Sequence, residues 1–421
     1  MLLLIIVFIF YIMHVHFMLK NIFWGVSGAQ FFNFYVPYRF SRDVAMETLV
    51  FCVSCAVAFV IGYIISKCVL DSRSAKSCGK LISEKYINKA IPFLNIFLAL
   101  QIGLGLYALS REGLNYSAIF NLKMSMNFLF ESRMLALVLL GFVYLNKPPE
   151  TWLKEKRLRF TAKLLFLYFI ISLFMQSRSV VFEFGTVIAF SWLMWQGNKI
   201  KIKYIVILLC IMVIPNLIVL PRFGGALDWQ TIIAGIFSFE YTVAMNNIVS
   251  AAIADSHPLL LVDLFWGIPS LLIPSPIRKA IGIDLTPGPG GDYYLKILED
   301  AGVFGGGFSL LAETYMNLGW WAILLFVFLG FLIGKFIKGA ARVGGVDLLY
   351  ATAPLMYASF IIAFRNNFAT FAKYSIQLIL IAMIIKIILK IRWIPLTSAT
   401  NNGQRVERVD ATTGDIVTAI D

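Results

Sequence analysis

Runs of about twenty apolar residues recur along almost the whole chain. A membrane-spanning helix needs about 20 predominantly apolar residues, so each run predicts a span. We predict about ten spans, over residues 2–19, 44–66, 91–109, 127–146, 164–176, 180–195, 204–221, 320–338, 345–364 and 375–392. The fifth and sixth form a hairpin broken at Ser177-Arg178-Ser179, with one interrupted helix as the alternative. The sequence therefore predicts an all-α polytopic membrane protein.

The composition excludes other classes. Hydrophobic residues make up 60% of the 421 and charged residues only 14%, against roughly 45–50% and about 25% in soluble domains. The net charge of +13 would suggest a nucleic-acid partner in a soluble chain. Here Lys and Arg gather in short loops between apolar runs, which is how topology is encoded. We therefore expect no nucleic-acid partner.

The same basic loops set the predicted orientation. Loops 67–90 and 147–163 each carry six Lys or Arg residues, and short basic loops stay cytoplasmic. If the spans alternate, the later basic clusters, including the tail from Lys386, fall on that side too. Both termini are then cytoplasmic, and the first run is a retained span rather than a signal peptide.

This topology divides the chain into four parts. Residues 1–221 form an N-terminal bundle of about seven spans, and residues 222–319 form one long periplasmic loop. Residues 320–392 are the C-terminal transmembrane helices, and 393–421 are a polar, flexible cytoplasmic tail.

The long outer loop has its own character. It holds nine acidic residues against four basic ones. Its apolar stretch Leu259 to Ile273 contains Asp263 and is too short to span comfortably, so the loop should contain short interfacial or re-entrant helices. A Gly- and Pro-rich part follows, from Pro274 to Gly307, but without the Gly-Lys-Ser/Thr of a nucleotide P-loop.

Three local patterns suggest a family. The stretch from Gly305 to Trp320, GGGFSLLAETYMNLGW, resembles the O-antigen polymerases, the oligosaccharide repeat unit polymerases of bacterial surface polysaccharide assembly. The turn Gln176-Ser177-Arg178-Ser179 and the turn Phe364-Arg365-Asn366-Asn367-Phe368 are similar to other landmarks of that family.

The resemblance implies a glycosyltransferase of the bacterial inner membrane. Such an enzyme moves a growing chain from its polyprenyl-pyrophosphate carrier onto a hydroxyl of the next lipid-linked repeat unit, at the outer face. The implied partners are the polyprenyl-pyrophosphate-linked oligosaccharide and membrane lipid, with a chain-length regulator protein as a further candidate. No cofactor is expected.

A lipid-pyrophosphate leaving group requires fixed cations at the membrane surface. Arginine suits this task, because its planar fork binds phosphate oxygens bidentately and stays charged. The candidates are the arginines where outer segments meet spans: Arg178, Arg222, Arg278 and Arg365. The alternative is that these side chains snorkel to lipid headgroups.

The reaction also requires a base near the attacking hydroxyl. Glu313 is the first candidate, followed by Asp292 and His257. His14 and His16 lie within the first predicted span, so His257 is the histidine on the predicted side. Tyr293 and Tyr294 could stack on sugar rings or belong to an interfacial aromatic belt. No spacing suggests a metal site.

Two further acids, Glu47 and Glu183, fall inside predicted spans, where a charge is costly. Glu183 follows Arg178 by about one and a half helical turns, so we expect those two to form an ion pair.

Two other functions remain open. An O-antigen ligase, which transfers finished polymer to lipid A core, would have the same plan. A transporter or flippase of lipid-linked oligosaccharide would instead favour charged residues along a central pathway and short loops on both sides.

Overall fold

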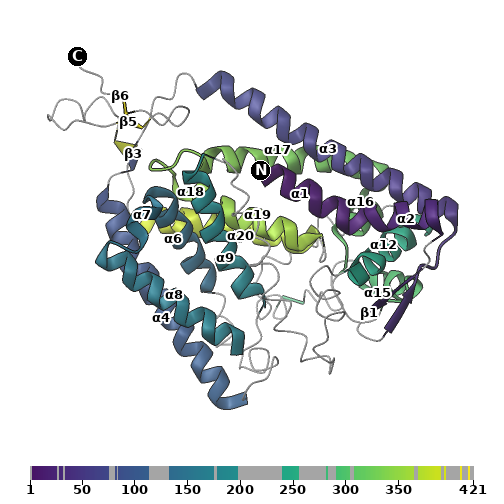
Figure 1. Ribbon diagram of the computed structural model, residues 1–421, viewed down its shortest axis with the longest axis horizontal. Helices are drawn as coiled ribbons and strands as arrows, with labels where there is room; N and C mark the ends of the chain where they lie inside the picture. The colour runs from purple at the N-terminus through teal and green to yellow at the C-terminus, as the bar shows by residue number, and fades with distance from the viewer. Residues whose placement is uncertain are drawn as a thin grey trace. The chain divides into compact units, whose positions relative to one another are not determined.

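The structure is a computed structural model, shown in Figure 1. It describes residues 2–25, 28–31, 34–74, 81–82, 84–112, 132–174, 178–197, 239–255, 281–282, 291–303, 308–364, 368–389, 393–394, 408–409 and 416–417. The chain divides into two compact units. The first comprises Met1–Lys67, Ile205–Lys335 and Leu355–Leu380; the second comprises Cys68–Tyr204, Phe336–Pro354 and Ile381–Asp421.

The first unit begins with one continuous helical stretch. It consists of α1 (Leu2–Phe10), the π-helical turn η1 (Tyr11–Val15) and α2 (His16–Trp24). The hairpin β1 (Gly28–Phe31) and β2 (Phe34–Pro37), paired antiparallel, leads into the long helix α3 (Arg42–Ser74). The later helices are α12 (Phe239–Ala254), α15 (Gly291–Asp300), α16 (Leu310–Leu318), α17 (Ala322–Ala340), α19 (Ala353–Ala363) and α20 (Phe368–Leu389).

Helix α17 has the dimensions and end residues of a membrane span. Its 19 residues give a length of about 28 Å, close to the hydrocarbon thickness of about 30 Å. The short 3₁₀ turn η5 (Gly319–Trp321) joins it to α16 and exposes Trp320 and Trp321, by 42% and 69%. Lys338 lies in its last turn. Aromatic residues at one end and a basic residue at the other are typical interface anchors.

Glycines allow α3 and α17 to approach closely. A Cβ on Gly330 would overlap the carbonyl oxygen of Phe59, and a Cβ on Gly62 would overlap that of Val327. Gly334, four residues after Gly330, faces the Ser66 hydroxyl in the same way. Small residues at this spacing let the backbones of membrane helices pack against each other.

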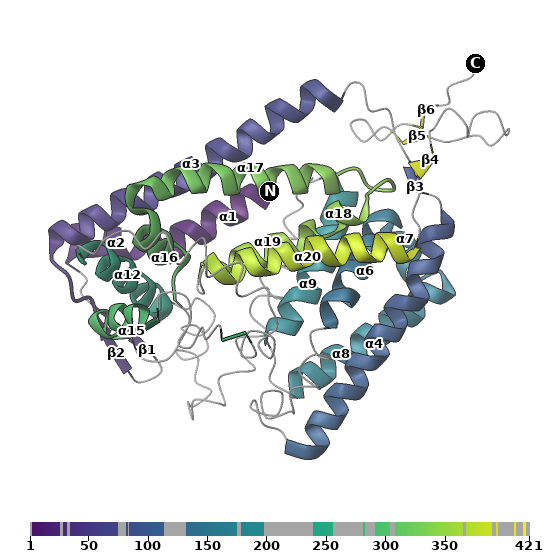
Figure 2. The ribbon, with the colours of Figure 1, turned by 180° about the vertical axis from the view of Figure 1, so that it is seen from behind.

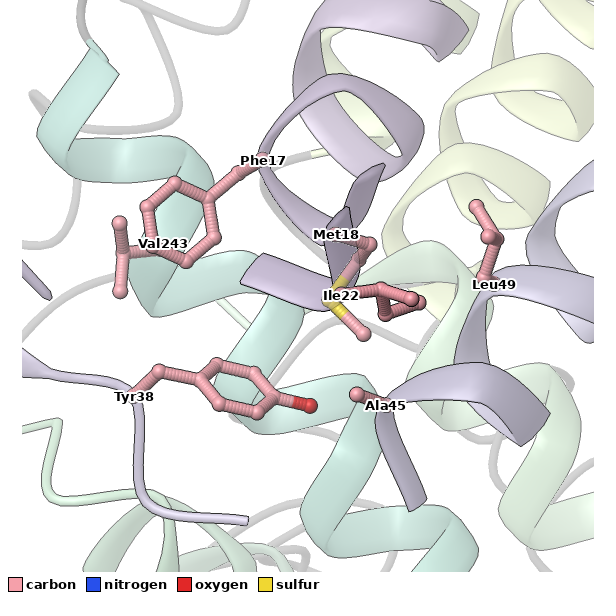
Figure 3. Close-up of a cluster of buried hydrophobic side chains, with 7 residues drawn as sticks. All are labelled: Phe17, Met18, Ile22, Tyr38, Ala45, Leu49 and Val243. Carbon is pink, nitrogen blue, oxygen red and sulfur yellow. The ribbon is translucent and has the colours of Figure 1, made fainter. Parts of the chain in front are cut away.

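Helix α12 packs against α2 and the first turns of α3. Figure 3 shows Val243 of α12 near Phe17 of α2, in a buried cluster that α2 and α3 complete. The cluster consists of Phe17, Met18, Ile22, Tyr38, Ala45, Leu49 and Val243. Helix α12 also packs against η1, α15 and α16, and α12 and α16 lie side by side in Figures 1 and 2. It is therefore an internal helix of the first unit.

The second unit is a bundle around α6 (Arg133–Asn146), whose residues from Ala136 onward are buried. Its other helices are α4 (Glu84–Glu112), α7 (Pro149–Trp152), α8 (Lys156–Phe174), α9 (Arg178–Trp195) and α18 (Leu348–Ala351). Short antiparallel pairs join β3 (Leu81–Ile82) to β4 (Trp393–Ile394) and β5 (Arg408–Val409) to β6 (Ile416–Val417).

The helical membrane class is confirmed. Among the described residues, five helical stretches are long and apolar enough to cross a membrane: Leu2–Trp24, Arg42–Cys68, Glu84–Arg111, Leu310–Ala340 and Phe368–Leu389. The described strands are only two to four residues long. The number of ten spans, the loop topology and the four-part division stay predictions, because 204–221 and 259–273 lie outside the described residues.

The fifth and sixth predicted spans correspond to two separate helices, α8 and α9, rather than to one interrupted helix. They pack through Tyr168 and Phe184, whose ring centroids are 5.3 Å apart. The run 345–364 is two helices, which meet at Thr352. Pro354 explains the break, because it has no N–H to donate to the preceding turn.

Candidate functional site

The helix α16, just before the Trp320–Trp321 pair, is buried although it carries polar side chains. Ser309, Glu313, Thr314 and Asn317 are at most 3% exposed. Thr314 and Asn317 satisfy part of their hydrogen-bonding capacity locally, since the Thr314 hydroxyl donates to the Leu311 carbonyl (3.0 Å) and the Asn317 amide to the Glu313 carbonyl (2.8 Å). The polar stretch predicted from the GGGFSLLAETYMNLGW pattern thus lies inside the first unit.

The carboxylate of Glu313 binds the start of α20. Its Oε2 accepts the backbone N–H of Phe368 and that of Ala369, the latter at 3.2 Å. The first N–H groups of a helix have no partner within the helix, and the positive end of the helix dipole favours a negative charge. Glu313 therefore caps α20 from a distant part of the chain.

One predicted phosphate-binding arginine is close to this contact in the sequence. Arg365 precedes Phe368 by three residues in the chain. Arg365 itself lies outside the described residues, so its role stays a prediction.

Helix α12 carries a second group of buried polar side chains, Asn246, Asn247 and Ser250. The Ser250 hydroxyl lies 2.8 Å from the Tyr38 hydroxyl and 2.9 Å from that of Thr48. Burial raises the pKa of Tyr38 to about 12, so its phenol stays protonated at neutral pH. Both side-chain atoms of Asn246 are buried, and within the described part of the chain they have no hydrogen-bond partner.

His14 is a third buried polar residue of the first unit. It is fully buried on the π-helical turn η1. Its ring centroid lies 5.9 Å from that of Phe10 and 5.8 Å from that of Phe364. Among the described residues, neither Nδ1 nor Nε2 has a hydrogen-bond partner.

Ring contacts give the depth of His14 along the helices. Phe10 touches Phe326, with centroids 5.9 Å apart, and Phe326 is four residues into α17 from Ala322. His14 follows Phe10 by four residues as well, and four residues correspond to about 6 Å of helix. Further along the chain, α2 packs against the first turns of α3. Phe51, on the same part of α3, touches Trp320. His14 therefore lies near the level of the tryptophan pair.

For the other predicted site residues, the structure describes at most the helix on which they lie. Asp292, Tyr293 and Tyr294 lie on α15, which packs against α12, and Arg178 is the first residue of α9 in the second unit. The side chains of these four residues are outside the description. His257, Arg222 and Arg278 lie outside the described residues altogether.

Two acids were predicted inside spans, Glu183 and Glu47. Glu183 Oε1 lies 3.7 Å from a guanidinium nitrogen of Arg133, and both side chains are largely buried. The ion pair predicted between Glu183 and Arg178 stays a prediction, because the Arg178 side chain lies outside the description. Glu47 lies within the candidate span Arg42–Cys68, as predicted, and its side chain is exposed on α3.

Sequence reasoning missed two elements of this region. His14 was set aside because it falls within an apolar run, and α12 was not predicted as a helix. The spacing of Asn246 and Ser250, one helical turn apart in an apolar stretch, could have indicated a buried polar face. In the described part of the chain, no group of three His, Cys, Asp or Glu side chains could hold a metal ion.

No family model, curated protein or solved structure matches this chain.

Proposed function

We propose that the chain is a polymerase of polyprenyl-pyrophosphate-linked oligosaccharides, acting at the outer face of the bacterial inner membrane. It transfers the growing glycan onto a hydroxyl of the next lipid-linked repeat unit and releases polyprenyl pyrophosphate. The observation that carries the proposal is the bond between the Glu313 carboxylate and the start of α20. It links the two parts of the chain, 305–320 and 364–368, that resemble O-antigen polymerases.

The depth of this contact suits a lipid-linked substrate. Glu313 precedes Trp320 and Trp321, which are exposed at one end of α17. Tryptophan prefers the membrane–water interface, and the pyrophosphate of a polyprenyl carrier lies at that same level. With the proposed cytoplasmic termini, this end of α17 faces the periplasm.

In this proposal, arginines hold the pyrophosphate. The candidates are the arginines at the ends of predicted spans, Arg178, Arg222, Arg278 and Arg365. A bidentate guanidinium stabilises the charge that develops on the departing pyrophosphate. Glu313 caps the start of α20, and its own role as a base stays a prediction beside those of Asp292 and His257.

The ligase and the flippase are the two alternative functions. A flippase would favour charged residues along a pathway through the spans, whereas most of the described buried polar side chains of the first unit lie on or directly beside α12, η1 and α16. The ligase shares the plan of the polymerase and differs in its acceptor, so the choice between them depends on an assay.

Arginine substitutions test the proposal. Arg178→Ala, Arg222→Ala and Arg365→Ala should each abolish chain extension while membrane insertion, followed by fractionation, stays normal. Arg342→Ala is the matched control, because Arg342 is exposed beyond the basic end of α17. Normal polymer length in all three variants would refute the proposed arginine site.

A further inference from the structure

The first turns of α4 and α8 lie at the same end of the second unit. The two helices pack side by side, as both ribbon views show (Figures 1 and 2). The Thr161 hydroxyl donates to Asn95 Oδ1 at 2.7 Å, and further along both helices the Tyr168 hydroxyl donates to Gln101 Oε1 at 3.4 Å. Because the contacts advance along both helices together, α4 and α8 run in the same direction and their starts are neighbours.

This shared end is strongly basic. The stretches 84–89 and 147–163 hold eight basic residues against three acidic ones. Lys147 is buried and donates to both Glu84, at 2.7 Å, and Glu155, at 2.9 Å, so one base takes up two of the three acids. The other seven bases are exposed, and among the described residues they form no ion pair. We call these seven side chains the basic surface: Lys85, Lys89, Lys154, Lys156, Arg157, Arg159 and Lys163.

The basic surface does not stabilise the helix that carries most of it. Lys156, Arg157 and Arg159 lie in the first turn of α8, which holds no acid. The positive end of a helix dipole disfavours cations at this place. Membrane topology favours bases in this loop, but it does not require them to be exposed and unpaired, as the buried Lys147 shows. An anion from outside the chain would supply the missing partner.

On α8, one exposed helix face continues from bases to apolar side chains. Its members recur at the spacing of a single face: Lys156, Phe160, Lys163 and Leu167. Phe160 and Leu167 are 53% and 43% exposed. The long stem of Lys163 can lie along this apolar surface while its ammonium group reaches back toward the bases.

Helix α4 repeats this arrangement. The members of its exposed face follow at the same spacing: Lys85, Lys89, Pro92 and Ile96. Ile96 is 62% exposed and lies about 10 Å of helix beyond Lys89. Both neighbouring helices therefore pass from cations to apolar side chains along an exposed face, in the order in which headgroups and hydrocarbon follow each other in a bilayer.

We propose that the basic surface binds the phosphate groups of anionic membrane lipids, whose acyl chains lie along the apolar continuation of the two faces. The guanidinium groups bind phosphate oxygens bidentately and the ammonium groups act as point charges. Clusters of four to eight Lys and Arg residues beside a membrane helix are typical of anionic-lipid contacts. The apolar continuation favours a lipid over an acidic peptide, because a lipid brings an anion and an apolar chain at this spacing. The inference does not depend on the proposed function.

The test is lipid binding by the purified full-length chain in a neutral detergent, titrated with short-chain phosphatidylglycerol or with phosphatidylcholine. Each Lys or Arg near an anionic lipid surface contributes about fivefold in affinity, the equivalent of about 1 kcal/mol. The wild type should therefore bind phosphatidylglycerol more tightly, by about 30-fold or more. The double variant Lys156→Gln/Arg159→Gln should lose about 30-fold in affinity for phosphatidylglycerol and little for phosphatidylcholine.

The matched control is Lys20→Gln/Arg42→Gln, which removes one exposed lysine and one exposed arginine from the first unit and should keep the wild-type affinities. Folding is followed by thermal unfolding without added lipid. The Tm of Lys156→Gln/Arg159→Gln should equal or exceed that of the wild type, because two cations leave the positive end of a helix dipole. Lys156→Arg/Arg159→Lys keeps both charges and should keep the affinity for phosphatidylglycerol.

Equal affinity of the wild type for the two lipids would overturn the proposal, and so would an unchanged preference in Lys156→Gln/Arg159→Gln. An equal loss in the control variant would show a general charge effect and would also contradict it. Inorganic phosphate is the third probe. It should not displace phosphatidylglycerol at equal concentration, since it lacks the apolar chain, and efficient displacement would assign the surface to a free anion instead of a lipid.

Discussion

Glu313 on α16 accepts the backbone N–H of Ala369 on α20 at 3.2 Å. The two residues are 56 positions apart, and the same carboxylate oxygen accepts the N–H of Phe368. The bond anchors the start of α20 to the helix that precedes the tryptophan pair.

Removing this carboxylate should destabilise the protein. Glu313→Ala leaves buried N–H groups at the start of α20 without a partner, which costs about 1–3 kcal/mol, whereas Glu313→Gln keeps an oxygen acceptor and should cost less. The measurement is thermal unfolding of the purified protein in detergent. Glu299→Ala, at an exposed position of α15, serves as the control. Equal Tm values for Glu313→Ala and Glu299→Ala would contradict the capping role.

The glycine contact between α3 and α17 gives a second prediction. In Gly330→Ala, the new methyl group overlaps the Phe59 carbonyl oxygen, so the two backbones must move apart at a cost of about 1–3 kcal/mol. Gly103→Ala is the matched control, because a Cβ there meets nothing within 4 Å and alanine favours the helix. Unfolding temperatures should fall for the first variant and stay equal or rise for the second. The reverse order would show that these helices are not in close contact.

A third prediction concerns Asn146 in the second unit. Its side-chain amide donates to the Val346 carbonyl at 2.9 Å, and its Oδ1 accepts the Val346 N–H at 2.8 Å. Asn146→Ala leaves both buried groups unpaired, so we expect a loss of about 2–4 kcal/mol in the free energy of unfolding. Ser110→Ala, which removes an exposed hydrogen bond, should change it little. A loss below about 0.5 kcal/mol for Asn146→Ala, the usual effect of surface substitutions, would rule out this pairing.

The fourth prediction is a dependence on pH. Burial disfavours the charge of Lys147, but its hydrogen bonds to Glu84 (2.7 Å) and Glu155 (2.9 Å) outweigh burial and raise the pKa of Lys147. A raised pKa in the folded state stabilises the protein below the unfolded pKa of about 10.4, and this stabilisation is lost as pH rises further.

Lys147→Met should therefore lower the Tm at neutral pH, and the gap to the wild type should narrow above about pH 10.5. Melting curves of both proteins across that range provide the measurement. A gap that widens in alkali would contradict the ion-pair account.

The sequence predicted the helical membrane class because long apolar runs are a local signal. It also placed the hairpin break between α8 and α9, where Arg178 interrupts two apolar stretches. Both features depend on neighbouring residues, which a single sequence displays directly.

Contacts between distant residues could not be predicted in this way. Glu313 was selected for its place beside a span, but its bond to Phe368 depends on how α16 and α20 pack. The apolar run around His14 predicts a span, but it does not reveal where along the helix the membrane surface lies. Helix α12 was missed since its polar residues resemble a loop until their neighbours are known.

The most direct test of the central claim is the product pattern of the purified chain in vesicles supplied only with polyprenyl-pyrophosphate-linked repeat units. The account predicts a ladder of lipid-linked glycans that grow by one repeat unit per step, with one polyprenyl pyrophosphate released for each step. Products that never exceed one repeat unit, or transfer that occurs only when lipid A core is added, would contradict it.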